Sequence, residues 1–480
     1  MAKFKQVIYK DFFWYALGMI IPMGINLIKT PLFTRHYSAE DYGYLGLVMM
    51  VFMYLSTVSY AWIASCIWRY YNAFQKKNIL PKFYANILFL YGISTIVMLF
   101  CGLLFVTFYH SPFLVFKLIF ICFFHFVTKE LLGLYYVMLR VKGEAKKSNL
   151  LTIGQVLSSF VLLCFFTFQL DFDISALLTS SIVIDALLLI ALGIYLQINQ
   201  RLKWCNFQLV HRKYLQIFVK FGSFILLSSL VTLLIVSSDR YILAMYDSIK
   251  HVGIYTKVYD IAQISITAFV FVYFSVINPK MNRELTHDVS QTNPLLQRYM
   301  YAYLVVLFPI VALLSIFSKE IAAILLGEEF RAGYTIMPYV FFSAFVYGLI
   351  TFNLNKLKFS NQLQSILIIL SITFVANLIL NFIFIPTYGY IGAAVTTLIS
   401  YGIMMVLFFK ADDLGMKQQV KKLQVLGSQS VVLMLFYVIT HWIRTIVELT
   451  IVYAIVLGLI YALVFGAIFF KTYKHLKIPV

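Results

Sequence analysis

Fourteen long apolar runs constrain the fold of this chain more than any other feature of its sequence. A run of about 20 apolar residues is long enough for a helix to cross a bilayer. Because a helix satisfies its own backbone hydrogen bonds, such runs predict an all-α polytopic membrane protein with about 14 transmembrane helices. The runs lie near 11–33, 43–66, 84–108, 113–138, 149–169, 174–196, 214–237, 252–277, 297–317, 333–354, 363–385, 390–410, 428–446 and 450–471.

The composition agrees with that class and argues against several others. The 480 residues are 62% hydrophobic and 12% charged, which is typical of a protein embedded in lipid. The net charge of +19 is expected to come from basic cytoplasmic loops rather than from a nucleic-acid surface. The five cysteines are scattered singly without metal-ligand spacing, so we expect no metal site. The chain also has no Gly-rich nucleotide motif, and we expect no cofactor.

The distribution of basic residues predicts the orientation of the chain. With the N-terminus inside, most of the 38 Lys and Arg residues lie in cytoplasmic loops or at the two termini. Both termini are therefore expected in the cytoplasm. No small-residue cleavage site follows the first apolar run, so we expect the first helix to remain as a membrane anchor.

The segment 363–409 predicts a tight helical hairpin. Asn377 and Asn381 are four residues apart and therefore share one helix face. Pro386 is expected to end the first helix, because proline lacks the backbone N–H donor. Small residues open the second helix, which favours close packing inside a bilayer.

Three sequence echoes at an offset of roughly 210 residues suggest two related halves. We therefore expect an N-lobe of helices 1–6 over residues 1–205 and a C-lobe of helices 7–12 over residues 206–410. Helices 13 and 14, over residues 411–480, lie outside the repeat.

Five motifs occur in order along the chain. They are Pro31-Leu32-Phe33-Thr34-Arg35 with Asp41-Tyr42-Gly43, Val252-Gly253-Ile254-Tyr255, Asn278-Pro279-Lys280, Glu320 with Gly327 and Phe330, and Asn377 to Ala394. This ordered set resembles the Wzx-type polysaccharide flippases of the MOP superfamily, which are relatives of the MATE drug exporters and the MurJ lipid II flippase. The resemblance implies two six-helix lobes in a V around a cavity that opens to each side in turn. It also implies a bacterial cytoplasmic membrane location.

The resemblance further implies a substrate and partners. The substrate would be an undecaprenyl-diphosphate-linked oligosaccharide of the O-antigen or capsule type. Polymerase and chain-length components of polysaccharide export would be further partners. The sequence leaves the glycan and the coupling ion open.

Basic residues in or next to the spans are the candidate contacts for an anionic diphosphate. They are Lys129, Lys257, Arg240, Lys29 and Arg35. Other roles stay open for each of them. Snorkelling to the interface would explain Lys29 and Arg35, an interfacial pair with Asp239 would explain Arg240, and a structural ion pair would explain Lys129.

Acidic and amide residues inside the spans are candidates for ion coupling and for sugar binding. Asp185, Glu130 and Asp260 could couple transport to H⁺ or Na⁺. Asp185 could instead be a structural carboxyl group, and Asp260 could neutralise Lys257 three residues away. Asn377 and Asn381 could line a polar cavity or could join two helices by hydrogen bonds.

The sequence favours a transporter over an enzyme. It contains no H-E-x-x-H motif, no P-loop and no Ser-His-Asp grouping. A lipid II flippase and a cation-coupled drug exporter remain alternatives on the same fold. An O-antigen polymerase or ligase is a more distant alternative, because the outer loops here are short.

Overall fold

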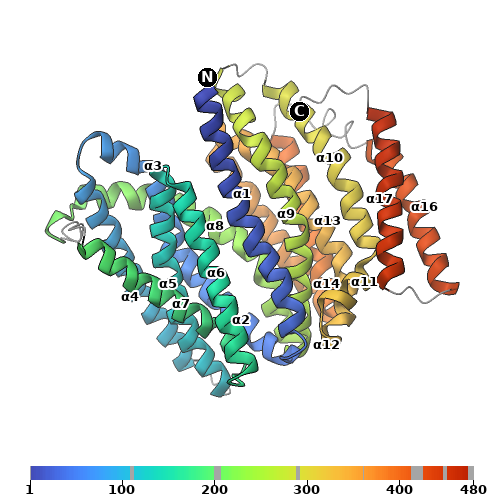
Figure 1. The fold of residues 1–480 in the computed structure, drawn as a ribbon, viewed down its shortest axis with the longest axis horizontal. Helices are drawn as coiled ribbons and strands as arrows, with labels where there is room; N and C mark the ends of the chain where they lie inside the picture. Colours follow the sequence, from blue (N-terminus) through green and yellow to red (C-terminus); the bar gives the residue numbers. More distant parts are fainter. Residues whose placement is uncertain are drawn as a thin grey trace. The chain divides into compact units, whose positions relative to one another are not determined.

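The computed structural model describes residues 2–108, 113–198, 207–287, 292–360, 362–411, 425–446 and 451–473, and within these ranges the chain forms helices and no strands. All fourteen predicted spans lie on these helices, so the predicted fold class is confirmed (Figure 1). The helices are α1 (Ala2–Phe33), α2 (Ala39–Ser56), α3 (Trp62–Lys76), α4 (Leu80–Phe108), α5 (Phe113–Val141), α6 (Ala145–Phe168), α7 (Ala176–Ile198), α8 (Arg212–Tyr246), α9 (Ile249–His287), α10 (Thr292–Ile316), α11 (Ser318–Leu325), α12 (Glu328–Arg331), α13 (Met337–Phe359), α14 (Leu363–Ala411), α16 (Val425–Ile446) and α17 (Ile451–Tyr473).

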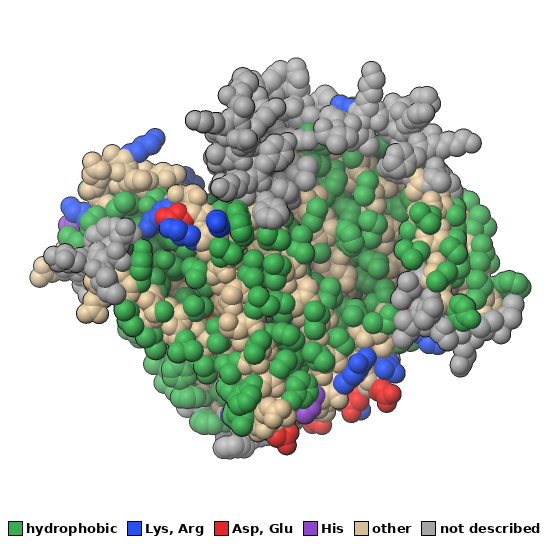
Figure 2. All heavy atoms as spheres, in the orientation of Figure 1, with side chains coloured by type: hydrophobic (Ala, Val, Ile, Leu, Met, Phe, Trp, Pro, Cys, Tyr) green, Lys and Arg blue, Asp and Glu red, His purple; other side chains and the backbone are tan. Residues whose placement is uncertain are grey.

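The chain is a multi-pass membrane protein. Within the described residues, ten helices are long and apolar enough to cross a membrane. Among the coloured side chains in Figure 2, hydrophobic ones predominate over the described part of the face. Apolar side chains of this kind can face acyl chains. The helices also satisfy their own backbone hydrogen bonds, as every segment that spans a membrane must.

The chain forms two compact units. Unit 1 comprises Met1–Lys29 and Glu40–Ser237, and unit 2 comprises Thr30–Ala39 and Ser238–Val480. Helix α1 therefore passes from unit 1 into unit 2 at its end, and α8 does so after Ser237. The predicted lobe boundaries and the predicted V remain predictions.

Unit 1 is built from α1 up to Lys29, α2 from Glu40, α3 to α7 and the part of α8 up to Ser237. A five-residue π-helical segment, Thr57–Ala61, joins α2 to α3. Two of its helices end in the same way: Ile79 donates to the Phe74 carbonyl at 3.1 Å, and Glu144 donates to the Leu139 carbonyl at 2.9 Å. These Schellman bonds require a left-handed residue, which Gly143 supplies after α5 with φ of 79°.

Helix α8 is longer than the sequence predicts. The predicted span ends at residue 237, with Asp239 and Arg240 at its end, whereas α8 continues to Tyr246. This prediction of the boundary was wrong. Asp239 and Arg240 therefore lie inside the helix, where both side chains are buried and contact α9.

The hairpin of unit 2 also differs in one detail from the prediction. Pro386 lies within helical backbone, and the non-helical residue of α14 is Gly389, with φ of 54° and ψ of −138°. Glycine reaches this conformation without the steric cost of a Cβ atom. The chain therefore reverses three residues later than expected, and the prediction that Pro386 ends the helix was wrong.

A polar network joins the two arms of α14. Asn377 donates to the Ser400 hydroxyl at 3.0 Å, and Asn381 donates to the Asn377 side-chain oxygen at 3.1 Å. Thr396 on the second arm donates to the Asn381 oxygen, and all four side chains are fully buried. Interhelical hydrogen bonds of this kind hold helices together in a membrane.

The last two helices pack against α10 and α11, as Figure 1 shows for α17. Their apolar contact is built from Phe317, Phe436 and Tyr461, and the rings of Phe436 and Tyr461 are stacked 4.1 Å apart. Arg444 of α16 makes a bidentate pair with Glu320 of α11, with Nη2 2.8 and 2.7 Å from the two oxygens. These contacts fasten α16 and α17 to unit 2.

Candidate functional site

Asp239 and Arg240 on α8 form the buried half of an ionic cluster in unit 2. The Arg240 side chain is 2% exposed, and its Nη1 atom lies 3.4 Å from the Asp239 Oδ1 atom. Tyr255 of α9 donates a hydrogen bond to the other Asp239 oxygen. The guanidinium also lies 5.4 Å from the centre of the Tyr255 ring and 4.8 Å from that of Tyr259, which are cation–π distances.

Asp260 and Lys257 on α9 form the exposed half of the same cluster. The Asp260 Oδ1 atom lies 4.0 Å from Arg240 Nη2, and its Oδ2 atom lies 3.7 Å from Lys257 Nζ. The Asp260 side chain is 43% exposed and that of Lys257 is 26% exposed. One carboxylate therefore bridges two cations at distances well beyond the 2.7–2.9 Å of a tight charged hydrogen bond.

The exposed half of the cluster lies in an apolar part of the chain. Lys257 and Asp260 are within the apolar stretch Ile249–Phe274 of α9. A charge in the middle of a span costs about 2.5–3.5 kcal/mol even on insertion scales, and pairing of the two side chains lowers that cost. The cluster thus combines a buried pair, Asp239 with Arg240, and a partly exposed pair, Lys257 with Asp260.

Asp185 lies in unit 1, where it ends a chain of polar side chains. It is 1% exposed and accepts a 2.6 Å hydrogen bond from the Gln155 amide of α6. The Gln155 oxygen in turn accepts a 3.0 Å hydrogen bond from Tyr136 of α5. Three helices therefore contribute to one buried polar chain around this carboxyl group.

The neighbouring Lys129 and Glu130 of α5 have separate surroundings. Glu130 accepts a 2.8 Å hydrogen bond from Ser56 of α2, just before the π-helical segment. Lys129 is exposed, and its ammonium lies 5.4 Å from the centre of the Phe126 ring. Neither makes an ion pair with a residue that the structure describes. His125, one turn before Lys129, is buried.

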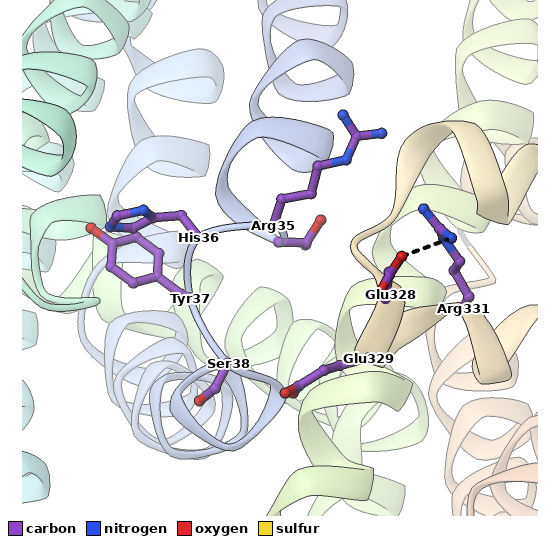
Figure 3. A pocket seen from close by; sticks show the side chains of 8 residues that line it. Arg35, His36, Tyr37, Ser38, Glu328, Glu329 and Arg331 are labelled. Atoms are coloured by element: carbon purple, nitrogen blue, oxygen red, sulfur yellow. Dashed lines mark ion pairs between the residues drawn. The ribbon is translucent and has the colours of Figure 1, made fainter.

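Arg35 lies on the loop of unit 2 that follows α1, and it borders a cavity of about 450 Å³. Figure 3 shows that loop facing α12, where Glu328 and Arg331 form an ion pair. The loop is fastened by a 2.9 Å bond from the Gly327 amide to the Thr34 hydroxyl and by a 2.9 Å bond from the Ala39 amide to Glu329. Arg35 itself donates to the Ile324 carbonyl at 3.3 Å.

Lys29, which is half-buried, is the last residue of unit 1 before this loop. Asn377 and Asn381 are 0% exposed, because both are used within the α14 network. This arrangement corresponds to the helix-joining role that the sequence left open, and their contact with a sugar remains a prediction.

The structure thus brings together three of the predicted site residues, Arg240, Lys257 and Asp260, within unit 2. Lys29, Lys129, Glu130 and Asp185 lie in unit 1, and their roles remain predictions. Sequence reasoning missed Tyr255, Tyr259 and Gln155, which supply the partners of the buried charges. The four-residue spacing of Tyr255 and Tyr259 in α9 was the available signal, because it places both rings on one helix face.

No cluster of three or more His, Cys, Asp or Glu side chains able to hold a metal ion was found within the ranges that the structure describes. Fold and site together define a multi-pass helical membrane protein with a partly exposed ionic cluster inside its apolar spans.

The chain belongs to the polysaccharide biosynthesis protein family, whose family model matches residues 8–285, which is more than half of the chain. Its fold is similar to that of several solved structures. The lipid II flippase MurJ in an inward closed conformation has a TM-score of 0.69 and 15% identity, and the match covers 95% of this chain and 99% of that chain.

Two MATE transporters are also similar in fold. An inward-facing multidrug resistance transporter of the MOP superfamily has a TM-score of 0.64 and 15% identity, covering 82% of this chain and 96% of that one. The transporter VcmN of Vibrio cholerae has a TM-score of 0.57 and 16% identity, with coverage of 85% and 97%. A comparison with curated protein sequences found no match.

Proposed function

We propose that this protein is a flippase that moves undecaprenyl-diphosphate-linked oligosaccharide repeat units across the bacterial cytoplasmic membrane. The proposed mechanism is ion-coupled alternating access with both termini in the cytoplasm. The proposed substrate belongs to an O-antigen or capsule pathway, and polymerase and chain-length components would act on it after transport. Membership of the polysaccharide biosynthesis protein family supports this choice.

The observation that carries the proposal is the partly exposed pair Lys257–Asp260 on α9. A diphosphate carries negative charge that is costly to move through a medium of low dielectric constant. Lys257 presents a partly exposed ammonium within the apolar stretch Ile249–Phe274 of α9. Such a group would lower the barrier for the head group while the lipid tail stays in the bilayer.

Lys129 would provide a similar contact from unit 1. Its side chain is exposed and makes no ion pair with a described residue, so no carboxylate has to be displaced before an anion binds. Lys29 and Arg35 are further proposed contacts at the outer end of α1 and on the following loop. Arg240 would act indirectly, because its buried guanidinium lies 4.0 Å from Asp260, the partner of Lys257.

Ion coupling is proposed at the acidic side chains inside the spans. Asp185 is the first choice, because its buried carboxyl group could bind or release a proton while the Gln155 and Tyr136 chain holds it in place. Glu130 and Asp260 are the other proposed coupling groups. Asp185→Asn should abolish the dependence of transport on the ion gradient while the binding of substrate is retained.

A second candidate is a flippase for lipid II. The solved structure similar over 95% of this chain is titled as a lipid II flippase, and lipid II also carries its glycan on a diphosphate. A MATE-type drug exporter is less well supported, since a cationic drug would meet an exposed lysine at Lys129. Transport assays with a peptidoglycan precursor and with an oligosaccharide-linked lipid would separate the first two functions.

The test is complementation of a strain that lacks its polysaccharide flippase. Lys257→Gln and Lys129→Gln should reduce surface polymer strongly at normal expression, because each removes one proposed anion contact. Lys117→Gln is the matched control, since Lys117 pairs with Asp173 in unit 1 through exposed side chains. Full polymer with both Lys257→Gln and Lys129→Gln would contradict the proposed role of these cations.

A further inference from the structure

Asp260 occupies a position between two cations that an anionic group of similar size could fill. Its two oxygens face Arg240 Nη2 at 4.0 Å and Lys257 Nζ at 3.7 Å. A phosphate group presents oxygens at comparable spacing and binds the same two kinds of side chain. Asp260 is thus placed where an anionic ligand would lie.

The two acidic residues of the cluster are held very differently. Asp239 is fully buried, touches Arg240 at 3.4 Å and accepts a hydrogen bond from Tyr255. Asp260 is 43% exposed, and its ionic contacts are long. Of the two carboxylates, Asp260 can move away from Lys257 without becoming a buried, unpaired charge, because it is already 43% exposed and keeps Arg240 nearby.

From these contacts we propose that Asp260 is an internal counter-ion that a diphosphate displaces from Lys257. Without substrate, the carboxylate neutralises the ammonium and lowers the cost of keeping it inside a span. When a diphosphate binds, its oxygens replace the Asp260 carboxylate as the partner of the Lys257 ammonium, and Asp260 remains beside Arg240. Asp260 would therefore set the affinity of the site, so that the head group can also leave on the opposite side. This inference rests on the proposed function.

The test is the affinity of the purified full-length protein in detergent for undecaprenyl diphosphate, measured by thermophoresis, with undecaprenol as the lipid that lacks phosphate. Asp260→Asn keeps the size of the side chain and removes the competing charge. It should lower the Kd about two- to fivefold, which is the range expected for a partly exposed ion pair. Lys257→Gln should raise the Kd, and Asp260→Glu should leave it near the wild-type value.

Asp173→Asn is the matched control, because it also removes one carboxylate that pairs with a lysine, Lys117 of unit 1. Its Kd should equal that of the wild type. An unchanged or weaker affinity in Asp260→Asn, or an equal gain in Asp173→Asn, would overturn the inference while leaving the proposed function intact. If the wild type binds undecaprenyl diphosphate no better than undecaprenol, the proposed function itself fails.

Discussion

Asp239 and Arg240 are neighbours on α8, and they still form an ion pair in which the Arg240 Nη1 atom lies 3.4 Å from the Asp239 Oδ1 atom. Successive side chains on a helix point about 100° apart, so the long Arg240 side chain must bend back toward its neighbour. The Tyr255 and Tyr259 rings lie against the guanidinium in that position. This buried pair contacts the exposed Lys257–Asp260 pair through Arg240 Nη2 and Asp260 Oδ1, which are 4.0 Å apart.

Removing only Arg240 should strongly destabilise the protein. Arg240→Gln leaves the Asp239 carboxylate buried without its cation, which costs about 3–5 kcal/mol when a buried pair is broken. Unfolding in detergent, followed by the loss of the monodisperse peak in size-exclusion chromatography on heating, measures this effect. The double variant Asp239→Asn with Arg240→Gln should recover much of the loss, and equal stability of the single variant and the wild type would contradict the buried pair.

Breaking the Glu320–Arg444 pair should loosen the last two helices from unit 2. Arg444→Gln removes a bidentate contact whose Glu320 side chain is 8% exposed, and we expect a loss of about 1.5–3 kcal/mol. Hydrogen exchange should then increase in α16 and α17 more than in α9. Glu328→Gln is the control, because its pair with Arg331 is exposed and longer, at 3.7 Å. Equal hydrogen exchange of α16 and α17 in the wild type and in Arg444→Gln would show that this pair does not hold the two helices.

A methyl group at residue 327 should disrupt the attachment of the loop that follows α1. A Cβ atom built on Gly327 meets the backbone carbonyl oxygen of Thr34, which cannot move aside as a flexible side chain would. Gly327→Ala should therefore cost about 1–3 kcal/mol. Gly24→Ala is the matched control, since a Cβ there has no neighbour within 4 Å. A melting temperature for Gly327→Ala that matches Gly24→Ala would refute this contact.

The Lys117–Asp173 contact should give a pH-dependent contribution to stability. Burial raises the pKa of the Asp173 carboxyl, but hydrogen bonds from Lys117 and Ser175 outweigh it and hold the pKa below its ordinary value of 3.8. Because the pKa is lower in the folded state, the ionised carboxylate stabilises the fold at pH values above the ordinary pKa of 3.8. This contribution is lost as the pH falls through the folded-state pKa. The difference in melting temperature between the wild type and Asp173→Asn should be present near neutral pH and shrink below pH 3.8. A melting-temperature difference that grows on acidification would contradict a lowered pKa of Asp173 in the folded state.

The sequence predicted the helices well because lipid imposes one strong rule on each of them. A long apolar run must become a helix, so all fourteen predicted spans lie on helices of the described chain. The same rule misled at the end of α8, where charged residues suggested an interface. The partners of Asp239 and Arg240 are on α9, and no pattern within α8 predicts those contacts.

The candidate site was only partly predictable for the same reason. The three-residue spacing of Lys257 and Asp260 predicts their pairing, and the structure has it at 3.7 Å. The contact of Asp260 with Arg240 depends on how α8 packs against α9, which sequence spacing does not determine. Gln155 as the partner of Asp185 likewise comes from a different helix.

The most direct test of the account is the transfer of a fluorescent undecaprenyl-diphosphate-linked oligosaccharide across proteoliposomes that contain the purified protein. The wild type should move the lipid faster than protein-free vesicles, Lys257→Gln should be close to the protein-free rate, and Lys117→Gln should match the wild type. Transfer by Lys257→Gln at the wild-type rate, or no transfer by the wild type with any diphosphate-linked glycan, would contradict it.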